Sequence, residues 1–108
     1  MKLVIAVINR DDVSAVTWGL TDNGFSSTWL ATSGGFLSAR NSTMLAGVEA
    51  DKVEQVIGII KQHSHSRTRV ISSAPLGAGR ELPGGMPVQV KVGGAVIFVV
   101  DAEQFLRV

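Results

Sequence analysis

The spacing of apolar residues changes several times along the chain, and each change predicts an element. Leu3 to Ile8 is an unbroken run of Val, Ile, Leu and Ala, which is typical of a central strand. Asp11 or Asp12 can cap a helix that follows, and Asn23-Gly24 supplies its stop. The inner face of that helix carries Val13, Val16, Thr17 and Leu20 at helical spacing.

The same pattern then occurs a second time. Phe25 to Thr32 is predicted to be a strand and Thr43 to Val48 the next, and acidic residues within 49–51 open a second helix. The apolar face of this helix carries Val53, Val56, Ile57 and Ile60. Two strand–cap–helix units in a short chain predict an α+β fold, a ferredoxin-like β-α-β-β-α-β sandwich with an antiparallel sheet.

The remainder of the chain is less regular. Arg67 to Ser73 suits an extra short strand, and the last strand is expected near Val88 to Val100. Pro75 to Gly85 is rich in Gly and Pro and has no period, so we expect a long loop that is mobile without ligand or partner. Asp101 to Phe105 suits a short terminal turn.

Composition narrows the class of protein. The 108 residues suit one domain, 1–108, and 45% of them are hydrophobic, which predicts a packed core. The net charge is +1 with no basic stripe, so nothing favours a nucleic-acid polymer as partner. No apolar run approaches the roughly 20 residues of a membrane span, and the opening run suits a strand better than a signal peptide. The chain has no cysteine, and we expect a cytoplasmic protein.

Few residues suggest catalysis or metal binding. His63-x-His65 has two potential ligands, but nothing nearby supplies a third and fourth, so a solvated helix end is the better interpretation. The carboxylates are scattered, and no spacing suggests a Ser-His-Asp arrangement. We therefore expect no enzyme, no catalytic residue, no metal and no resident cofactor.

The segment from Phe25 to Thr43 suits a binding loop. Gly34-Gly35 gives backbone freedom and allows a ligand to approach the main chain closely. Phe36-Leu37 is costly to expose in a loop unless it covers something, and Thr28 offers an uncharged hydrogen-bonding group. Gly34-Gly35 is not a phosphate-binding P-loop, because no Lys-Ser/Thr follows.

This segment also carries a family resemblance. From Thr28 to Thr43 it resembles the T-x-L-A-[ST]-[ST]-G-G-F-L-x-x-x-N-[ST]-T signature of the PII-like cyclic-di-AMP receptor family, within the nitrogen-regulatory PII superfamily. The likeness extends to the opening 1–7, to Gly47-Val48-Glu49 and to 92–99. It implies a homotrimer of ferredoxin-like subunits, not an enzyme. It also implies that cyclic-di-AMP binds between subunits and that mobile loops signal to a protein partner.

The residues that match the family's site are Thr28, Gly35, Phe36, Leu37, Asn41, Gly47 and Phe98. By this resemblance, Asn41 and the backbone at Gly47 hydrogen-bond adenine, and amides within 35–37 meet a phosphate. The apolar side chains of the set cover the base, a contact that contributes about 1–3 kcal/mol. Phe98 also lies in a run that suits a buried strand, so core packing and ligand contact both stay open for it.

Three positions depart from the family pattern. Ser26 and Ser38 stand where the family commonly has basic residues, and Arg40 stands where Gly is usual. A dianionic dinucleotide needs cations, and each charge-assisted hydrogen bond contributes about 1.5–3 kcal/mol. Arg40 is therefore predicted to be a ligand-binding residue that partly compensates, and a solvated loop residue is the alternative.

Two other functions stay open beside the cyclic-di-AMP sensor. One is a PII-like trimer that binds ATP or AMP in the same clefts, and the other is a ferredoxin-like enzyme or scaffold without a nucleotide. The missing acid–base cluster argues against the enzyme, and the Gly-Gly-Phe-Leu loop argues against the bare scaffold. Trp18 and Trp29 each suit either the core or a subunit interface.

Overall fold

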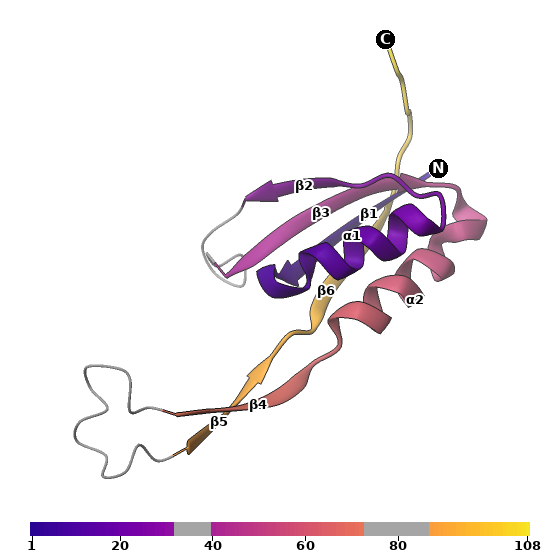
Figure 1. Cartoon of the computed structure of the whole chain (residues 1–108). Coiled ribbons are helices and arrows are strands. Elements are labelled where there is room, and N and C mark those ends of the chain that lie inside the picture. The colour runs from indigo at the N-terminus through magenta and orange to yellow at the C-terminus, as the bar shows by residue number, and fades with distance from the viewer. Residues whose placement is uncertain (32–39, 73–86) are drawn as a thin grey trace.

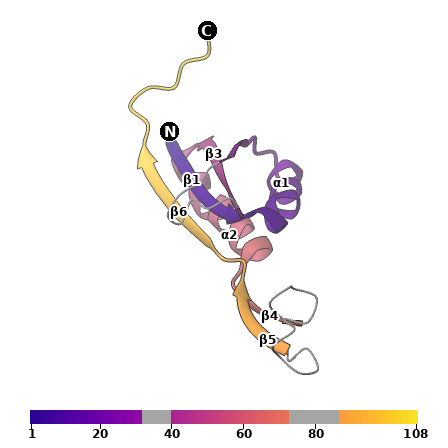
Figure 2. The same cartoon turned by 90° about the vertical axis from the view of Figure 1, so that its left-hand side faces the viewer.

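Two helices pack on one face of a four-stranded antiparallel sheet (Figures 1 and 2). The computed structural model describes residues 1–31, 40–72 and 87–108. The sheet contains β1 (Lys2–Asn9), β2 (Thr28–Ala31), β3 (Asn41–Val48) and β6 (Ala95–Asp101), and the helices are α1 (Val13–Asp22) and α2 (Val53–Ser64). The strand order β2-β3-β1-β6, with every neighbouring pair antiparallel, confirms the predicted ferredoxin-like α+β fold.

The core lies between the helices and the sheet. Alternate residues of the central strands face the helices, because side chains along a strand point to opposite faces. The fully buried side chains of this layer include Val4 and Ile8 on β1, Met44 on β3, Val16 and Leu20 on α1, and Val56 and Ile60 on α2. Burying each such side chain contributes roughly 1.5–3 kcal/mol, so this layer holds the fold together.

The other face of the sheet has no helix over it (Figure 2). Leu30, Val96, Phe98 and Val100 lie there and are 42–46% exposed. Of the two roles left open for Phe98, packing in the core of its own chain is therefore excluded, and ligand contact stays a prediction. Its strand is at the edge of the sheet, and its side chain points away from the helices, so no described element covers it.

The last strand divides in two, which corrects the single strand expected at 88–100. β5 (Pro87–Val92) pairs with β4 (Arg67–Ser72) in a separate two-stranded ribbon, and β6 joins the main sheet. Gly93 and Gly94 separate them with φ values of +80° and +86°, which L-residues with side chains rarely adopt. The predicted extra strand at Arg67 is confirmed, and the ribbon it forms points away from the sheet (Figure 1).

The ribbon is attached to α1 by an ion pair. Arg67 donates to both carboxylate oxygens of Asp12, with Nη2–Oδ1 at 2.9 Å and Nη1–Oδ2 at 3.3 Å. Asp12 is 6% exposed, and its hydrogen bond raises the pKa of the Arg67 guanidinium above its ordinary value. Asp12 does occupy the N-cap position of α1, but its side chain makes no cap hydrogen bond, so the predicted capping role is wrong. Its oxygens bind Arg67 instead.

Other boundaries differ modestly from expectation. A 3₁₀ turn precedes each helix, Arg10–Asp12 before α1 and Ala50–Lys52 before α2. β3 begins earlier than predicted, and β2 begins at Thr28 rather than at Phe25. Asp101 ends β6, and the residues after it have a single bend at Glu103 but no turn, so the terminal turn expected at 101–105 is wrong. The loop predicted at 75–85 lies outside the described residues.

Two glycine-to-alanine substitutions should change stability in opposite directions. Gly58→Ala, within α2 where a Cβ would meet nothing within 4 Å, should stabilise by about 0.5–1 kcal/mol. Gly93→Ala should cost at least about 1–2 kcal/mol for the left-handed backbone alone. Its Cβ would also overlap Nη1 of Arg67 and lie 2.8 Å from the carbonyl oxygen of His65. Urea unfolding of both variants checks this, and equal midpoints would contradict it.

Candidate functional site

The described site residues on the strands lie on one face of the sheet. Phe98 pairs with Ile5, Ile5 with Leu45, and Leu45 with Thr28, so Phe98 and Thr28 belong to one row across the sheet. Asn41 and Gly47 are spaced by even numbers of residues from Leu45 along β3, which places them on the same face. This is the face that the helices leave uncovered.

Thr28 and Gly47 lie together at one end of that face. They border a cavity of about 360 Å³ whose lining also includes Ser26, Phe105 and Arg107. The Phe105 ring carbon Cε2 lies 3.8 Å from the point where a Cβ on Gly47 would be, so the ring packs beside the glycine backbone. The cavity thus combines a hydroxyl, a glycine backbone, an aromatic ring and a guanidinium.

Phe105 and Arg107 were not predicted as site residues. They follow the last strand in a segment without regular structure, where no apolar period indicates an orientation. The available signal was chemical: an aromatic residue and an arginine occur close together after the final apolar run. Arg107 lies at the same cavity as Ser26, the position that lacks the family's usual cation.

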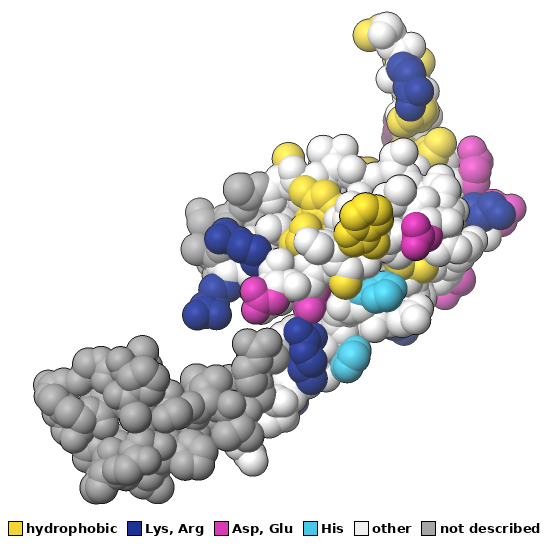
Figure 3. Space-filling model, in the orientation of Figure 1, with side chains coloured by type: hydrophobic (Ala, Val, Ile, Leu, Met, Phe, Trp, Pro, Cys, Tyr) yellow, Lys and Arg dark blue, Asp and Glu magenta, His cyan; other side chains and the backbone are white. Residues whose placement is uncertain are grey.

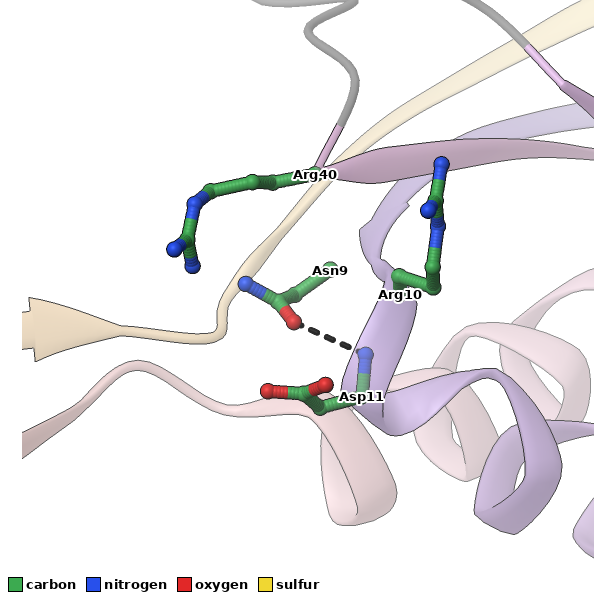
Figure 4. Close-up of a pocket in the computed structure, with 4 residues that line it drawn as sticks. All are labelled: Asn9, Arg10, Asp11 and Arg40. Atoms are coloured by element: carbon green, nitrogen blue, oxygen red, sulfur yellow. Dashed lines mark hydrogen bonds between the residues drawn. The ribbon is translucent and has the colours of Figure 1, made fainter.

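Arg40 lies at the opposite end of the face. It borders a second cavity of about 360 Å³ with Asn9, Arg10 and Asp11 (Figure 4). The backbone N–H of Arg10 donates to the carbonyl of Arg40 at 2.7 Å, which joins the end of β1 to the start of β3. The two guanidinium groups do not converge, since Arg10 turns toward β3 while Arg40 extends on the side of Asn9.

Asn41 borders a smaller cavity of about 140 Å³ beside the Arg40 cavity. Its lining includes Asn9, which is the cross-strand partner of Asn41, and the two glycines Gly93 and Gly94 at the base of the ribbon. Asn41 is half-buried and already engaged in an interaction within the chain. This end of the sheet therefore brings two amide side chains together with the glycine backbone at the base of the ribbon.

Among the described residues, the two ends border separate cavities. Asn41 and Gly47 are six residues apart on β3, which corresponds to about 20 Å along an antiparallel strand. Phe98 lies on the exposed edge strand β6, and its row across the sheet runs between the rows that contain Asn41 and Gly47. The predicted site residues Gly35, Phe36 and Leu37, and the departure at Ser38, lie outside the described residues.

Charge gathers at the Arg40 end. Figure 3 shows basic and acidic side chains side by side where α1 begins. Among the described residues, no group of three or more His, Cys, Asp or Glu side chains is arranged to hold a metal ion. No helix in the described ranges is long and apolar enough to cross a membrane.

The two tryptophans lie away from the uncovered face of the sheet. Trp18 is 67% exposed on the outside of α1, so of its two predicted places it does not occupy the core. Trp29 packs against the core on the helix side of β2, and its indole N–H is buried without a partner among the described residues. A role of either residue at a subunit interface stays a prediction.

The fold and the polar ends of the uncovered sheet face define a small ferredoxin-like α+β protein with no helical lid on one side. The model of the cyclic-di-AMP receptor family matches residues 1–108, and the chain belongs to that family. The structure is similar to a crystal structure of a functionally unknown protein from Pediococcus pentosaceus ATCC 25745. The two share 34% identity with a TM-score of 0.78, over 99% of this chain and 96% of that chain.

Proposed function

We propose that this chain is a PII-like signal-transduction protein that binds cyclic-di-AMP between the subunits of a homotrimer. Its membership of the receptor family supports a nucleotide ligand. One observation carries the proposal further. Thr28, Asn41, Gly47 and Phe98 share the uncovered face, yet the residues at its two ends are about 20 Å apart in one chain. A second subunit that packs on this face brings one of its own polar ends close to a polar end of the first subunit.

The proposal gives the uncovered face two roles. Its apolar part, which includes Ile5, Leu45 and Val100, packs against neighbouring subunits and removes exposed apolar area from water. Its polar ends stay open as clefts for the ligand. In this arrangement Phe98 covers a base, and Thr28, Asn41 and the backbone of Gly47 hydrogen-bond it. Gly35, Phe36 and Leu37 act as the family resemblance implies.

The charge for the phosphates comes from residues outside the usual positions. With Ser26 and Ser38 uncharged, we assign the charge for the phosphates to Arg40, which borders one cavity together with Arg10, and to Arg107 at the other end. Arginine pairs with phosphate oxygens in a forked geometry. The proposal further includes a cytoplasmic location, no catalytic activity and a downstream protein partner.

The trimer can be tested with two neighbouring valines on β6. Val100 is 44% exposed on the uncovered face, and Val99 is 39% exposed on the opposite face. Light scattering at micromolar concentration should give three times the subunit mass for the parent and for Val99→Asp. Val100→Asp should give one subunit's mass, because a carboxylate would be buried in the interface. A parent protein that scatters as a single subunit would rule out the trimer.

Arg40 and Asn41 should affect binding in different ways. Arg40→Ala should weaken cyclic-di-AMP binding by about 1.5–3 kcal/mol, or roughly ten- to a hundred-fold, and the effect should shrink at high salt. Asn41→Ala should weaken it with little salt dependence, because the amide contacts the base. Arg10→Ala serves as the comparison within the same cavity, since its side chain also borders that cavity but turns toward β3 (Figure 4), and we expect it to weaken binding less. Calorimetric titration at low and high salt measures all three.

The same calorimetry decides the ligand. Parallel titrations with cyclic-di-AMP, ATP and AMP should show the tightest binding for cyclic-di-AMP. Tighter binding of ATP or AMP would leave the proposed trimer intact but would replace cyclic-di-AMP as the proposed ligand. No binding of any of the three would contradict the nucleotide proposal. Equal binding of cyclic-di-AMP by the parent and Arg40→Ala at low salt would contradict the role of Arg40 alone.

A further inference from the structure

Asn9 lies where the two cavities at the Arg40 end meet. It is the last residue of β1, half-buried, and it borders both the Arg40 cavity and the Asn41 cavity. Its cross-strand partner is Asn41. The family signature and the residue spacing did not identify Asn9 as a site residue. Its position between Arg40 and Asn41 places it within the proposed nucleotide site.

The orientation of the Asn9 amide is fixed by its own backbone turn. Oδ1 accepts a hydrogen bond from the backbone N–H of Asp11 at 2.9 Å. An amide turned the other way would place its NH₂ group against that N–H, two donors facing each other. The Asp11 N–H therefore determines which atom of Asn9 faces the cavity, and that atom is Nδ2.

The exposed atoms beside Asn9 are also donors. Figure 4 shows Nδ2 of Asn9 directed away from Asp11, on the side where the Arg40 guanidinium extends. Neither group has an acceptor among the described residues. The Asp11 carboxylate also borders the cavity, on the other side of Asn9. An occupant that satisfies the two donors must offer acceptors only, and it must lie on the Arg40 side, away from the carboxylate.

We propose that Asn9 is a specificity-determining residue that donates from Nδ2 to a phosphate oxygen of the nucleotide, beside Arg40. This inference rests on the proposed function and names the part of the ligand read at this cavity. A phosphodiester oxygen accepts and never donates, so a locked amide N–H selects it. A base edge that presents an amino group at this point is rejected.

Two isosteric substitutions test the inference with opposite signs. Asn9→Asp replaces the donor by a negatively charged acceptor and keeps Oδ1 for the Asp11 N–H, so thermal stability should be unchanged. Its affinity for cyclic-di-AMP should fall at least about ten- to a hundred-fold in calorimetry. Asp11→Asn removes a negative charge that faces the same cavity and should raise the affinity. Both effects should shrink with added salt.

The outcomes separate this inference from the proposed function. If the parent binds cyclic-di-AMP and Asn9→Asp binds it equally well, Asn9 reads no phosphate and the proposed function stands. If Asn9→Asp does not fold, Asp11→Asn decides, and an affinity equal to that of the parent overturns the inference.

If the parent binds no nucleotide, the proposed function fails and inorganic pyrophosphate becomes the probe. Binding is then followed through the Asn9 side-chain NH₂ signals in ¹⁵N NMR spectra of the parent and of Asp11→Asn. Pyrophosphate that shifts the Asn9 NH₂ signals in the parent, with tighter binding in Asp11→Asn, supports an anion site at Asn9. No shift overturns it.

Discussion

The rest of this structure depends on one constraint, which is that two helices cover one face of a four-stranded sheet. Alternation along each strand then gives every residue one of two environments. Val4, Ile8 and Met44 enter the core, while Phe98 and Val100 on β6 point to the opposite face of the sheet and stay exposed. An apolar sheet face left open on a small chain needs a cover, and a second copy of the same surface is the simplest one.

The attachment of the β4–β5 ribbon is a second constraint, and it acts through very few groups. Gly93 and Gly94 allow the chain to leave one sheet and enter another within two residues. Arg67 then ties the base of the ribbon to Asp12, a nearly buried carboxylate at the start of α1. Because Gly93 and Gly94 also border the Asn41 cavity, the base of the ribbon and one end of the proposed site share the same backbone.

The elements were predictable from the sequence where one period dominated. The apolar spacing of Val16 with Leu20, and of Val56 with Ile60, identified both helices and their buried faces. The sequence could not show which face Phe98 occupies, because all residues of 95–100 are apolar and no alternation distinguishes the two faces of the strand. It also could not show that Asp12 binds Arg67, 55 residues away, in place of capping its own helix. Such contacts depend on tertiary geometry and leave no local pattern.

The distribution of charge links the proposed assembly to the proposed ligand. A phosphodiester needs cations, yet Arg40 and Arg107 lie at opposite ends of the uncovered face in one chain. One subunit therefore offers a dinucleotide only part of the charge and hydrogen bonding that it requires. In a site between subunits, each neighbour supplies a different end of the same face. Binding then stabilises the assembly, and assembly raises affinity by the same free energy, because linkage between binding and association is reciprocal.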